Sequence, residues 1–432
     1  MNEEQKKAVT SKAKATLVVA GPGSGKTRVI IQRLIYLIEQ GVKPENILAL
    51  TFSRPAALEM KTRVAEAAPA AFSHLWVDTF HAFSAEVLRQ WGDYIGLNPF
   101  FEIATQEDSL AILAGILGEL DLATINVNLE AVLNFISRAK DEAILDDEYA
   151  AYASNLQSEL KPNQLSASQL AYVYTTYQKE LQRQGLLDFG DLILKTLALL
   201  KENRKVRHYW QQQFKHILVD EFQDTNYAQG ELLKLLKGPH TSLFVVGDDD
   251  QSIYRFRGAS LKNILDFQET FKPTYKVTLN KNYRSGQEIV NASQALIQNN
   301  QERLPKRLAP AFNQEDAVYL IETETTEAQA DYVGHKILQL KKEYGWDYKD
   351  FALLFTSVRN EAAPFIKRLS QQGIPFTVAN FDNLMAAPVI RQLLAWLKLI
   401  TNPFSWSALT SILVNFFHFE PEEVAQLNQQ RL

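Results

Sequence analysis

The feature that most constrains this chain is a glycine-rich segment at residues 20–27, AGPGSGKT. It lies between an apolar run at 15–20 and an amphipathic run at 26–39, which predicts a strand, a tight turn and a helix N-terminus. Glycines let backbone N–H groups face phosphate oxygens, a lysine adds charge, and a threonine hydroxyl can ligate magnesium. The expected phosphate-binding residues are Ala20, Gly21, Gly23, Ser24, Gly25, Lys26 and Thr27, with Ala20 where the general motif has glycine. The motif predicts a nucleotide site; a glycine-rich turn before a core helix is the structural alternative.

The same strand and helix alternation recurs in the first part of the chain. Apolar, β-branched runs, each followed by a turn and an amphipathic segment, occupy residues 15–20, 47–52, 75–78, 217–220, 243–247 and 275–279. This alternation predicts an α/β fold with a parallel sheet covered by helices. From about residue 85 to 187 the pattern changes to helical periodicities with no convincing strand, as at 108–120 and 129–140. A helical insertion is expected there.

A second alternation follows the proline-containing stretch 304–310. Strands are expected at 317–322, 351–356 and 375–379, with helices near 327–343 and 360–372. Residues 388–432 are again mostly helical in pattern. The predicted fold class is α/β: a phosphate-loop domain with a parallel sheet, a helical insertion, and a partial second α/β domain.

Composition limits the partners and the compartment. The chain has 432 residues and a net charge of −5, so any nucleic-acid site must be a local feature. It has no cysteine, which excludes disulfides, cysteine-based zinc sites and a thiol nucleophile. Because the first residues lack a secretory pattern and the apolar runs are too short to span a bilayer, we expect a cytoplasmic protein with no membrane partner.

Two acids directly follow the apolar residues 217–219. Asp220 and Glu221 are therefore predicted at the carboxyl edge of the sheet, where α/β folds build their sites. Asp220 is expected to bind magnesium together with Thr27, and Glu221 to orient or deprotonate an attacking water. An acidic strand-to-helix turn is the alternative for the pair taken alone, but the nearby lysine loop favours the catalytic interpretation.

Another apolar run ends in GDDDQSIYRFRGA at residues 247–259, which interleaves polar and aromatic side chains. Gln251 is expected to hydrogen-bond a γ-phosphate, while Tyr254, Phe256 and Arg257 offer stacking and phosphate contacts to a nucleic acid. Such a segment could couple the two ligands. The alternative is a loop whose aromatic side chains are buried in the core.

Together these segments resemble the superfamily 1 DNA helicases of the UvrD/Rep/PcrA type, whose motifs occur here in the same order. Asn2 and Gln5 resemble the adenine-reading glutamine motif, and the alanine at position 20 is typical of the family. LNKNYRS at 279–285 resembles motif IV, which implies that Tyr283 and Arg28 sandwich adenine and that Arg284 reaches the γ-phosphate. The resemblance therefore implies that the protein binds ATP and Mg²⁺.

The resemblance also implies contacts with single-stranded DNA. TFSRPAA at 51–57 resembles motif Ia, although SRP departs from the usual TNK, and TFHAF at 79–83 resembles motif Ib. DFGDL at 188–192 is similar to the segment that re-enters the motor domain after the insertion. Phe256 stands where many members have tryptophan. The implied DNA-binding residues are Phe52, Arg54, Thr79, His81, Tyr254, Phe256 and Arg257.

The resemblance implies RecA-like motor domains. Residues 1–85 with 188–280 would form the ATP-binding domain and 86–187 its helical insertion, while 281–385 would begin a second RecA-like domain and 386–432 a second insertion. No counterpart is found for the later TxHxxKGxE segment or the final arginine-bearing motif.

The implied activity is that of an ATP-hydrolysing 3′–5′ DNA helicase or translocase, acting on single strands and duplex junctions in repair or replication. The alternatives are an ATP- and DNA-binding module that does not unwind, the motor part of a helicase–nuclease, and a small-molecule kinase. A C-terminal half, a nuclease or a loading factor would be the protein partners.

Overall fold

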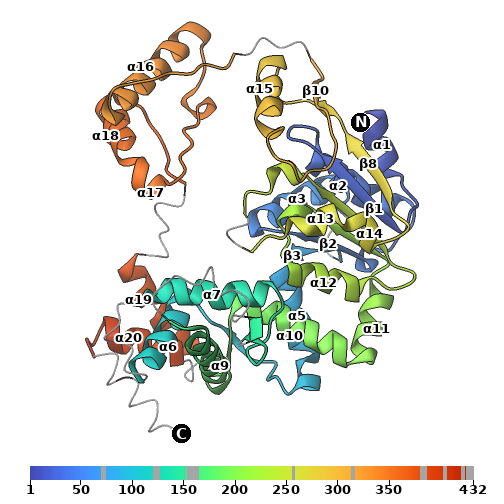
Figure 1. The fold of residues 1–432 in the computed structure, drawn as a ribbon, viewed down its shortest axis with the longest axis vertical. Helices are drawn as coiled ribbons and strands as arrows, with labels where there is room; N and C mark the ends of the chain where they lie inside the picture. Colours follow the sequence, from blue (N-terminus) through green and yellow to red (C-terminus); the bar gives the residue numbers. More distant parts are fainter. Residues whose placement is uncertain are drawn as a thin grey trace. The chain divides into compact units, whose positions relative to one another are not determined.

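The computed structural model describes residues 1–69, 74–119, 127–149, 151–152, 165–254, 258–312, 317–379, 387–401, 406–419 and 424. Two compact units make up the chain, Met1–Ala317 and Val318–Leu432, and each is described by itself (Figure 1). Within these described residues, no helix has the length and apolar character needed to cross a membrane.

A six-stranded parallel sheet forms the centre of the first unit (Figure 1). Its strands run in the order β3-β2-β6-β7-β1-β8, so the phosphate-loop strand β1 lies between β7 and β8. All six strands that the sequence predicts in this region are confirmed. Their bounds are β1 (Ala15–Ala20), β2 (Ile47–Thr51), β3 (Trp76–Thr79), β6 (His216–Val219), β7 (Ser242–Gly247) and β8 (Tyr275–Leu279).

Helices cover both faces of the sheet, which explains why β1 and β2 are buried along their whole length. Side chains alternate between two cores: Leu17 and Val19 of β1 face one core, while Val18 and Ala20 face the other. The second core is completed by α1 (Glu3–Val9), α2 (Lys26–Glu39) and α3 (Arg54–Ala67). The first is completed by α5 (Phe80–Trp91), α10 (Phe189–Glu202), α11 (Arg204–Gln213), α12 (Tyr227–Leu236), α13 (Leu261–Leu265) and α14 (Phe267–Thr270).

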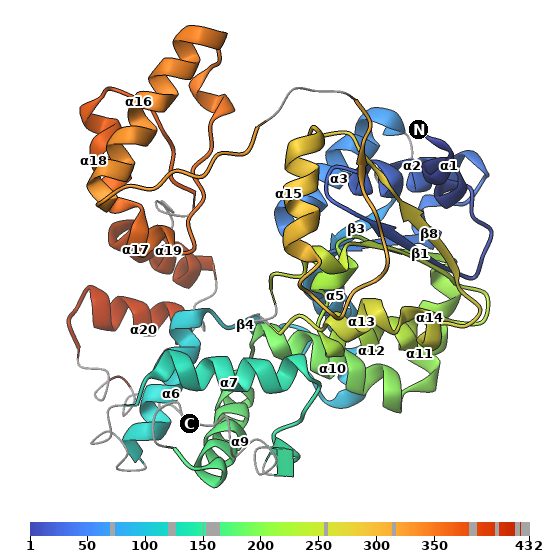
Figure 2. The same ribbon diagram turned by 45° about the horizontal axis from the view of Figure 1, so that its top comes forward.

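The expected helical insertion consists of α6 (Gln106–Glu119), α7 (Leu129–Asp141) and α9 (Ala167–Arg183), which enclose a core of their own (Figure 2). The expectation of no strand there was wrong in one detail. β4 (Glu102–Ile103) and β5 (Leu186–Leu187) pair in parallel where the chain enters and leaves the insertion. A two-residue ladder is too short to produce a recognisable alternation in the sequence.

An ion cluster joins the insertion to the sheet domain. Lys140 at the end of α7 has a fully buried side chain, and its Nζ lies 2.6 Å from Asp188 Oδ2 and 2.9 Å from Asp191 Oδ1. Asp188 and Asp191 also form a reciprocal cap at the start of α10. The DFGDL segment therefore fixes the re-entry helix as well as the insertion.

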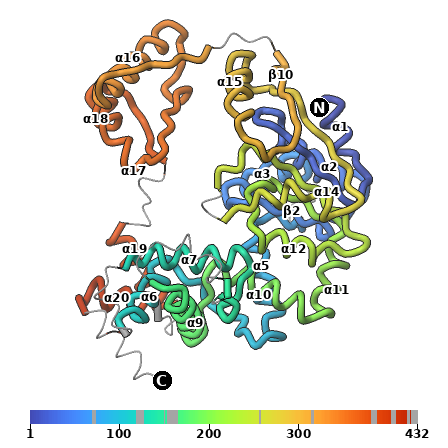
Figure 3. Tube along the Cα trace, viewed as in Figure 1, coloured from blue at the N-terminus to red at the C-terminus, as the bar shows by residue number. Residues whose placement is uncertain are grey.

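After β8 the chain forms β9 (Lys281–Asn282), α15 (Gln287–Ile297) and β10 (Ala309–Pro310) (Figure 3). β9 and β10 pair in parallel, which brings the segment after α15 back to the start of motif IV. This return places residues 303–311 beside the sheet edge that carries the candidate site.

The second unit contains α16 (Thr326–Tyr344), α17 (Val358–Glu361), α18 (Ala363–Gln371), α19 (Pro388–Thr401) and α20 (Trp406–Asn415). Its described residues form no strand at 317–322, 351–356 or 375–379, contrary to the expectation from the sequence. Alternating burial is nevertheless present, because Phe351 and Leu353 pack beside the Ile337 and Leu369 core while Leu354 is 93 % exposed. A period-two pattern reports which face is buried, whereas a strand also needs a neighbour's backbone hydrogen bonds.

Candidate nucleotide and DNA site

The phosphate loop has the predicted strand, turn and helix order, between β1 and α2. Gly23 and Gly25 adopt left-handed backbone angles, with φ of 69° and 88°. A Cβ on Gly23 would also lie 2.7 Å from Asn282 Oδ1, so a side chain there would meet both strain and a clash. The Ser24 hydroxyl donates to the Gly21 carbonyl at 2.6 Å and closes the turn. The loop conformation therefore requires glycine.

Lys26 begins α2 and lies against the acids that follow β6. Its Nζ is 3.5 Å from Glu221 Oε2, and only 9 % of the Lys26 side chain is exposed. Thr27 is half-buried beside it, while Arg28 is exposed. Since β6, β7 and β1 are successive parallel strands, their carboxyl ends bring these groups to one edge of the sheet.

Three carboxylates gather at the end of β6. Burial, reinforced by the charge of Glu221, raises the pKa of Asp220 to about 7. The same two causes raise the pKa of Asp224 to about 6, and Asp224 Oδ1 is buried with no hydrogen-bond partner. Crowded carboxylate oxygens with one nearby lysine are the hard donors that a divalent cation prefers. Oxygen donors of this kind suit magnesium, although the described residues contain no group of three or more acidic or histidine side chains arranged to hold a metal ion.

Glu221 has an unusual backbone. Its φ of 47° and ψ of 47° lie in the left-handed region, which costs roughly 1–2 kcal/mol for a residue with a Cβ. Gln223 holds this turn: its Nε2 donates to Glu221 Oε2 at 2.8 Å, and its Oε1 accepts from the Asp248 N–H at 2.9 Å. Gln223 was not selected from the sequence, where its only signal is its place between the acids and the next strand. It links the acid pair to the Gln251 segment.

Gln251 lies on the short turn that follows β7. Its Nε2 donates to Asp248 Oδ2 at 2.5 Å, and Asp248 is fully buried. Three residues later, the Tyr254 ring stacks on Phe52 with centroids 5.4 Å apart and planes 22° apart. One short segment thus reaches from the acid cluster to an aromatic pair. Phe256 and Arg257 lie outside the described residues.

The motif IV residues are tied to the phosphate loop. Tyr283 N donates to the Gly23 carbonyl at 2.8 Å, and Asn282 Nδ2 donates to the Pro22 carbonyl at 3.0 Å. Asn282 Oδ1 in turn accepts from the Arg284 N–H at 2.7 Å. Asn282 was not selected as a site residue from the sequence, although the following residues, Tyr283 and Arg284, were. It anchors the turn that carries Tyr283 and Arg284.

The N-terminal glutamine motif also reaches this loop. Gln5 Nε2 donates to the Ser24 carbonyl at 2.9 Å, and Asn2 Nδ2 donates to the Tyr283 hydroxyl at 3.0 Å. Asn2 and Gln5 form a reciprocal cap on α1 as well. The structure therefore brings Gln5, Tyr283 and the phosphate loop together.

The remaining DNA-contact candidates have structural contacts of their own. Thr79 Oγ1 accepts from the Ala82 N–H at 3.2 Å and caps α5. His81 stands edge-to-face on Phe189, with centroids 5.6 Å apart. Burial, and then the charge of Arg54, lowers the pKa of His81 to about 4, so its imidazole is neutral at pH 7. Arg54 is exposed at the start of α3.

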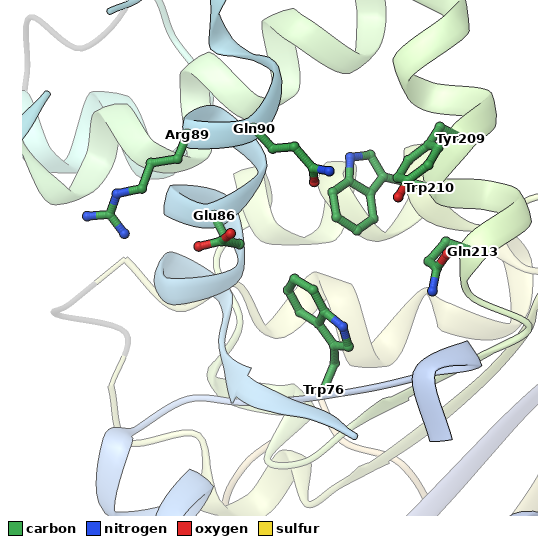
Figure 4. A pocket seen from close by; sticks show the side chains of 7 residues that line it. All are labelled: Trp76, Glu86, Arg89, Gln90, Tyr209, Trp210 and Gln213. Atoms are coloured by element: carbon green, nitrogen blue, oxygen red, sulfur yellow. The ribbon is translucent and has the colours of Figure 1, made fainter. Parts of the chain in front are cut away.

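A separate hollow lies between β3, α5 and α11 (Figure 4). Trp76 and Trp210 meet edge-to-face there, with centroids 5.8 Å apart. None of the residues selected from the sequence lines it. The lining residues are Trp76, Glu86, Arg89, Gln90, Tyr209, Trp210 and Gln213.

Comparison with known proteins gives the same family from both parts of the chain. The family model described as UvrD/REP helicase N-terminal domain matches residues 1–272, and that of the UvrD-like helicase C-terminal domain matches 277–430. The chain is 35 % identical over 405 residues to the ATP-dependent DNA helicase PcrA of Leuconostoc citreum, which covers 93 % of this chain and 53 % of that protein.

Relatives in two staphylococci agree. ATP-dependent DNA helicase PcrA of Staphylococcus epidermidis strain RP62A is 35 % identical over 403 residues, and that of Staphylococcus aureus strain Mu50 is 34 % identical over 403 residues. Each alignment covers 93 % of this chain and 54 % of the relative, so the chain spans about half the length of the curated relatives it matches. The chain belongs to the UvrD/REP helicase family.

Proposed function

We propose that this chain is the ATP-binding motor portion of a 3′–5′ DNA helicase or translocase that moves along single-stranded DNA. The observation that carries the proposal is the contact of Lys26 with Glu221 at a sheet edge where Gln223 links the acids to the Gln251 segment. The names of the relatives and the two family matches support the same activity.

The triphosphate of ATP would lie on the backbone N–H groups of residues 21–27, with its adenine near Gln5, Tyr283 and Arg28. Thr27 and Asp220 would hold magnesium, which supplies charge neutralisation for the phosphate oxygens when bound. The fit rests on the hard oxygen donors and on the raised pKa of Asp220. An adjacent cation favours the charged form of such a carboxyl.

The protein's own residues would then divide the reaction. The Lys26 ammonium shifts from Glu221 toward phosphate oxygen, which leaves the Glu221 carboxylate available to accept a proton from water. The Gln251 amide and the Arg284 guanidinium would stabilise charge on the γ-phosphate. Gln223 keeps Glu221 in place during the transfer.

DNA would bind along the aromatic end of the same segments. The stacked Phe52 and Tyr254 rings offer a platform for bases. Single strands and duplex junctions are the proposed ligands, with a C-terminal half, a nuclease or a loading factor as protein partners. The proposed contacts are Phe52, Arg54, Thr79, His81, Tyr254, Phe256 and Arg257.

The proposed domain organisation divides the chain into four parts. Residues 1–85 and 188–280 would form the ATP-binding RecA-like domain, and 86–187 its helical insertion. Residues 281–385 would begin the second RecA-like domain, and 386–432 a second insertion. Hydrolysis of ATP by the first of these domains would drive movement along the strand.

The alternative is a module that binds ATP and DNA without unwinding. ATP turnover measured with and without single-stranded DNA, together with strand separation of a tailed duplex, distinguishes the two. Stimulation of turnover by DNA is expected for the motor. If DNA and ATP bind and DNA leaves turnover unchanged, the module interpretation holds instead.

A further inference from the structure

A buried ion cluster follows β7, and the function proposed above gives no role to the lysine at its centre. The three aspartates at 248–250 surround Lys306, whose Nζ lies 3.0 Å from Asp248, 2.5 Å from Asp249 and 2.9 Å from Asp250. Only 2 % of the Lys306 side chain is exposed, and the side chains of Asp248 and Asp249 are fully buried. Arg303 adds a paired contact with Asp250 at 2.6 and 3.0 Å.

Lys306 supplies the positive charge that stabilises the three clustered aspartates. Burial by itself would lower the pKa of Lys306, yet the three carboxylates hold it above the ordinary lysine value. Buried carboxylates without a counter-charge are strongly destabilising, because their solvation is lost without compensation. Lys306 therefore determines where the aspartates lie.

Asp248 in turn positions the side chain of Gln251. Its Oδ1 faces Lys306, while its Oδ2 accepts from Gln251 Nε2 at 2.5 Å. An amide side chain has a donor end and an acceptor end, and only the donor end can bind a phosphate oxygen. Because Asp248 accepts one of the two Nε2 hydrogens of Gln251, it fixes the rotamer of that side chain. The second N–H of Nε2 then occupies a defined position.

The segment that carries Lys306 also touches the phosphate loop. The Leu304 N–H donates to Asp249 Oδ2 at 2.7 Å. Leu308 lies over Gly21, where an added Cβ would be 2.6 Å from Leu308 Cδ1. The Ala309 N–H donates to the Asn280 carbonyl at 2.9 Å, within the motif IV segment. The segment 304–309, which contains Lys306, therefore contacts three parts of the candidate site.

We propose that Lys306 is a positioning residue for γ-phosphate recognition, acting through Asp248 to present the Gln251 amide to ATP. The inference rests on the proposed function, because it takes ATP as the ligand. It predicts that Lys306 contributes to discrimination between a triphosphate and a diphosphate and contributes little to affinity for ADP.

The test compares the affinity of the full chain for ADP and for a non-hydrolysable ATP analogue with a β,γ-imido bridge. Lys306→Met is expected to weaken analogue binding about tenfold, the effect of one lost hydrogen bond, and to leave ADP binding unchanged. Arg303→Met is the matched control, since it removes a charge from the same cluster without a contact to Asp248. It should bind both nucleotides like the wild type.

A double-variant cycle identifies the route. If Lys306 acts through Gln251, Lys306→Met has no further effect on analogue affinity in a Gln251→Ala background. Asp248→Asn, which keeps the side-chain shape, should reproduce the loss should Lys306→Met fail to fold. Equal losses in both backgrounds, or equal losses for ADP and analogue, overturn the inference. Failure of the wild-type chain to bind either nucleotide overturns the proposed function as well, and the wild-type titration reports that result separately.

Discussion

At the scale of single residues, Glu221 combines a strained backbone with a carboxylate at the candidate catalytic position. Its left-handed backbone is held by hydrogen bonds through Gln223, and its carboxylate faces Lys26. Strain of this kind persists only where surrounding contacts determine the conformation, and it concentrates at functional sites. The turn therefore keeps the carboxylate at the sheet edge instead of letting it point into solvent.

Glu221→Gln should retain ATP binding and lose turnover. The amide preserves the shape and the contact with Gln223, but it cannot accept a proton from water. General-base catalysis contributes about 10²- to 10⁴-fold, so DNA-stimulated turnover should fall within that range. Glu231→Gln, at a half-buried glutamate paired with Lys234, is the control and should keep full turnover. A Glu221→Gln protein with wild-type turnover would remove the assignment of Glu221 as the base.

At the scale of elements, the turns after β2 and β7 meet in the Phe52 and Tyr254 stack. Replacing either ring with alanine should weaken single-strand binding by about 1–3 kcal/mol, because a base would lose its stacking partner. Fluorescence anisotropy with a labelled oligonucleotide measures the change. Tyr275→Ala is the control, since this exposed tyrosine begins β8 at the opposite end of the strand from the site. Unchanged affinity in both test variants would assign the pair to packing.

The joint between α7 and α12 is predicted to depend on pH. Burial raises the pKa of Asp141 from 3.8 to about 7 and outweighs the hydrogen bond from Asn226, which lowers it; the charges of Asp188 and Glu142 raise it further. The folded protein therefore keeps a proton between about pH 4 and 7 that the unfolded chain releases. Stability contributed by this proton is present below pH 4 and is lost as pH rises to about 7.

Asp141→Asn should abolish that dependence, because its amide oxygen still accepts from Asn226 and carries no titratable proton. Thermal unfolding midpoints between pH 4 and 8 measure the effect. The variant should gain stability relative to the wild type as pH rises through this range, then hold a constant difference above about pH 7. Asp147→Asn, at an exposed aspartate after the same helix, is the control. Parallel curves for Asp141→Asn and the wild type would contradict the prediction.

The six strands of the sheet were predictable because apolar runs with regular turns between them leave a strong local pattern. So were Lys26, Asp220 and Glu221, since strand ends place them without knowledge of the tertiary fold. Gln223, Asn282 and Lys306 were not, because each has a partner far away in the sequence: Asp248 at 25 residues, Pro22 at 260 and Asp249 at 57, respectively. The strands expected in the second unit rested on an apolar sequence pattern, which does not specify a pairing partner, and the described residues at those positions form none of them.

At the scale of the whole molecule, the groups proposed to surround the γ-phosphate all come from the first compact unit, Met1–Ala317. The curated relatives are nearly twice as long as the aligned region. Arginines supplied from a second domain or partner to a phosphoryl-transfer site accelerate turnover by about 10³- to 10⁵-fold. If residues 1–432 supply no such arginine, they should bind ATP well and hydrolyse it slowly when tested alone.

We therefore expect the 432-residue chain to bind ATP with an affinity similar to that of an extended protein, while its DNA-stimulated turnover is lower by about 10³-fold or more. The extended protein would be a fusion of this chain to the non-aligned part of the Leuconostoc citreum relative. Steady-state turnover and nucleotide affinity, measured on both, separate binding from catalysis. A fusion carrying Lys26→Ala controls for contaminating ATPase, because it removes the phosphate-binding charge. Rapid turnover and unwinding by the unfused chain would show that residues 1–432 already contain every group the reaction requires.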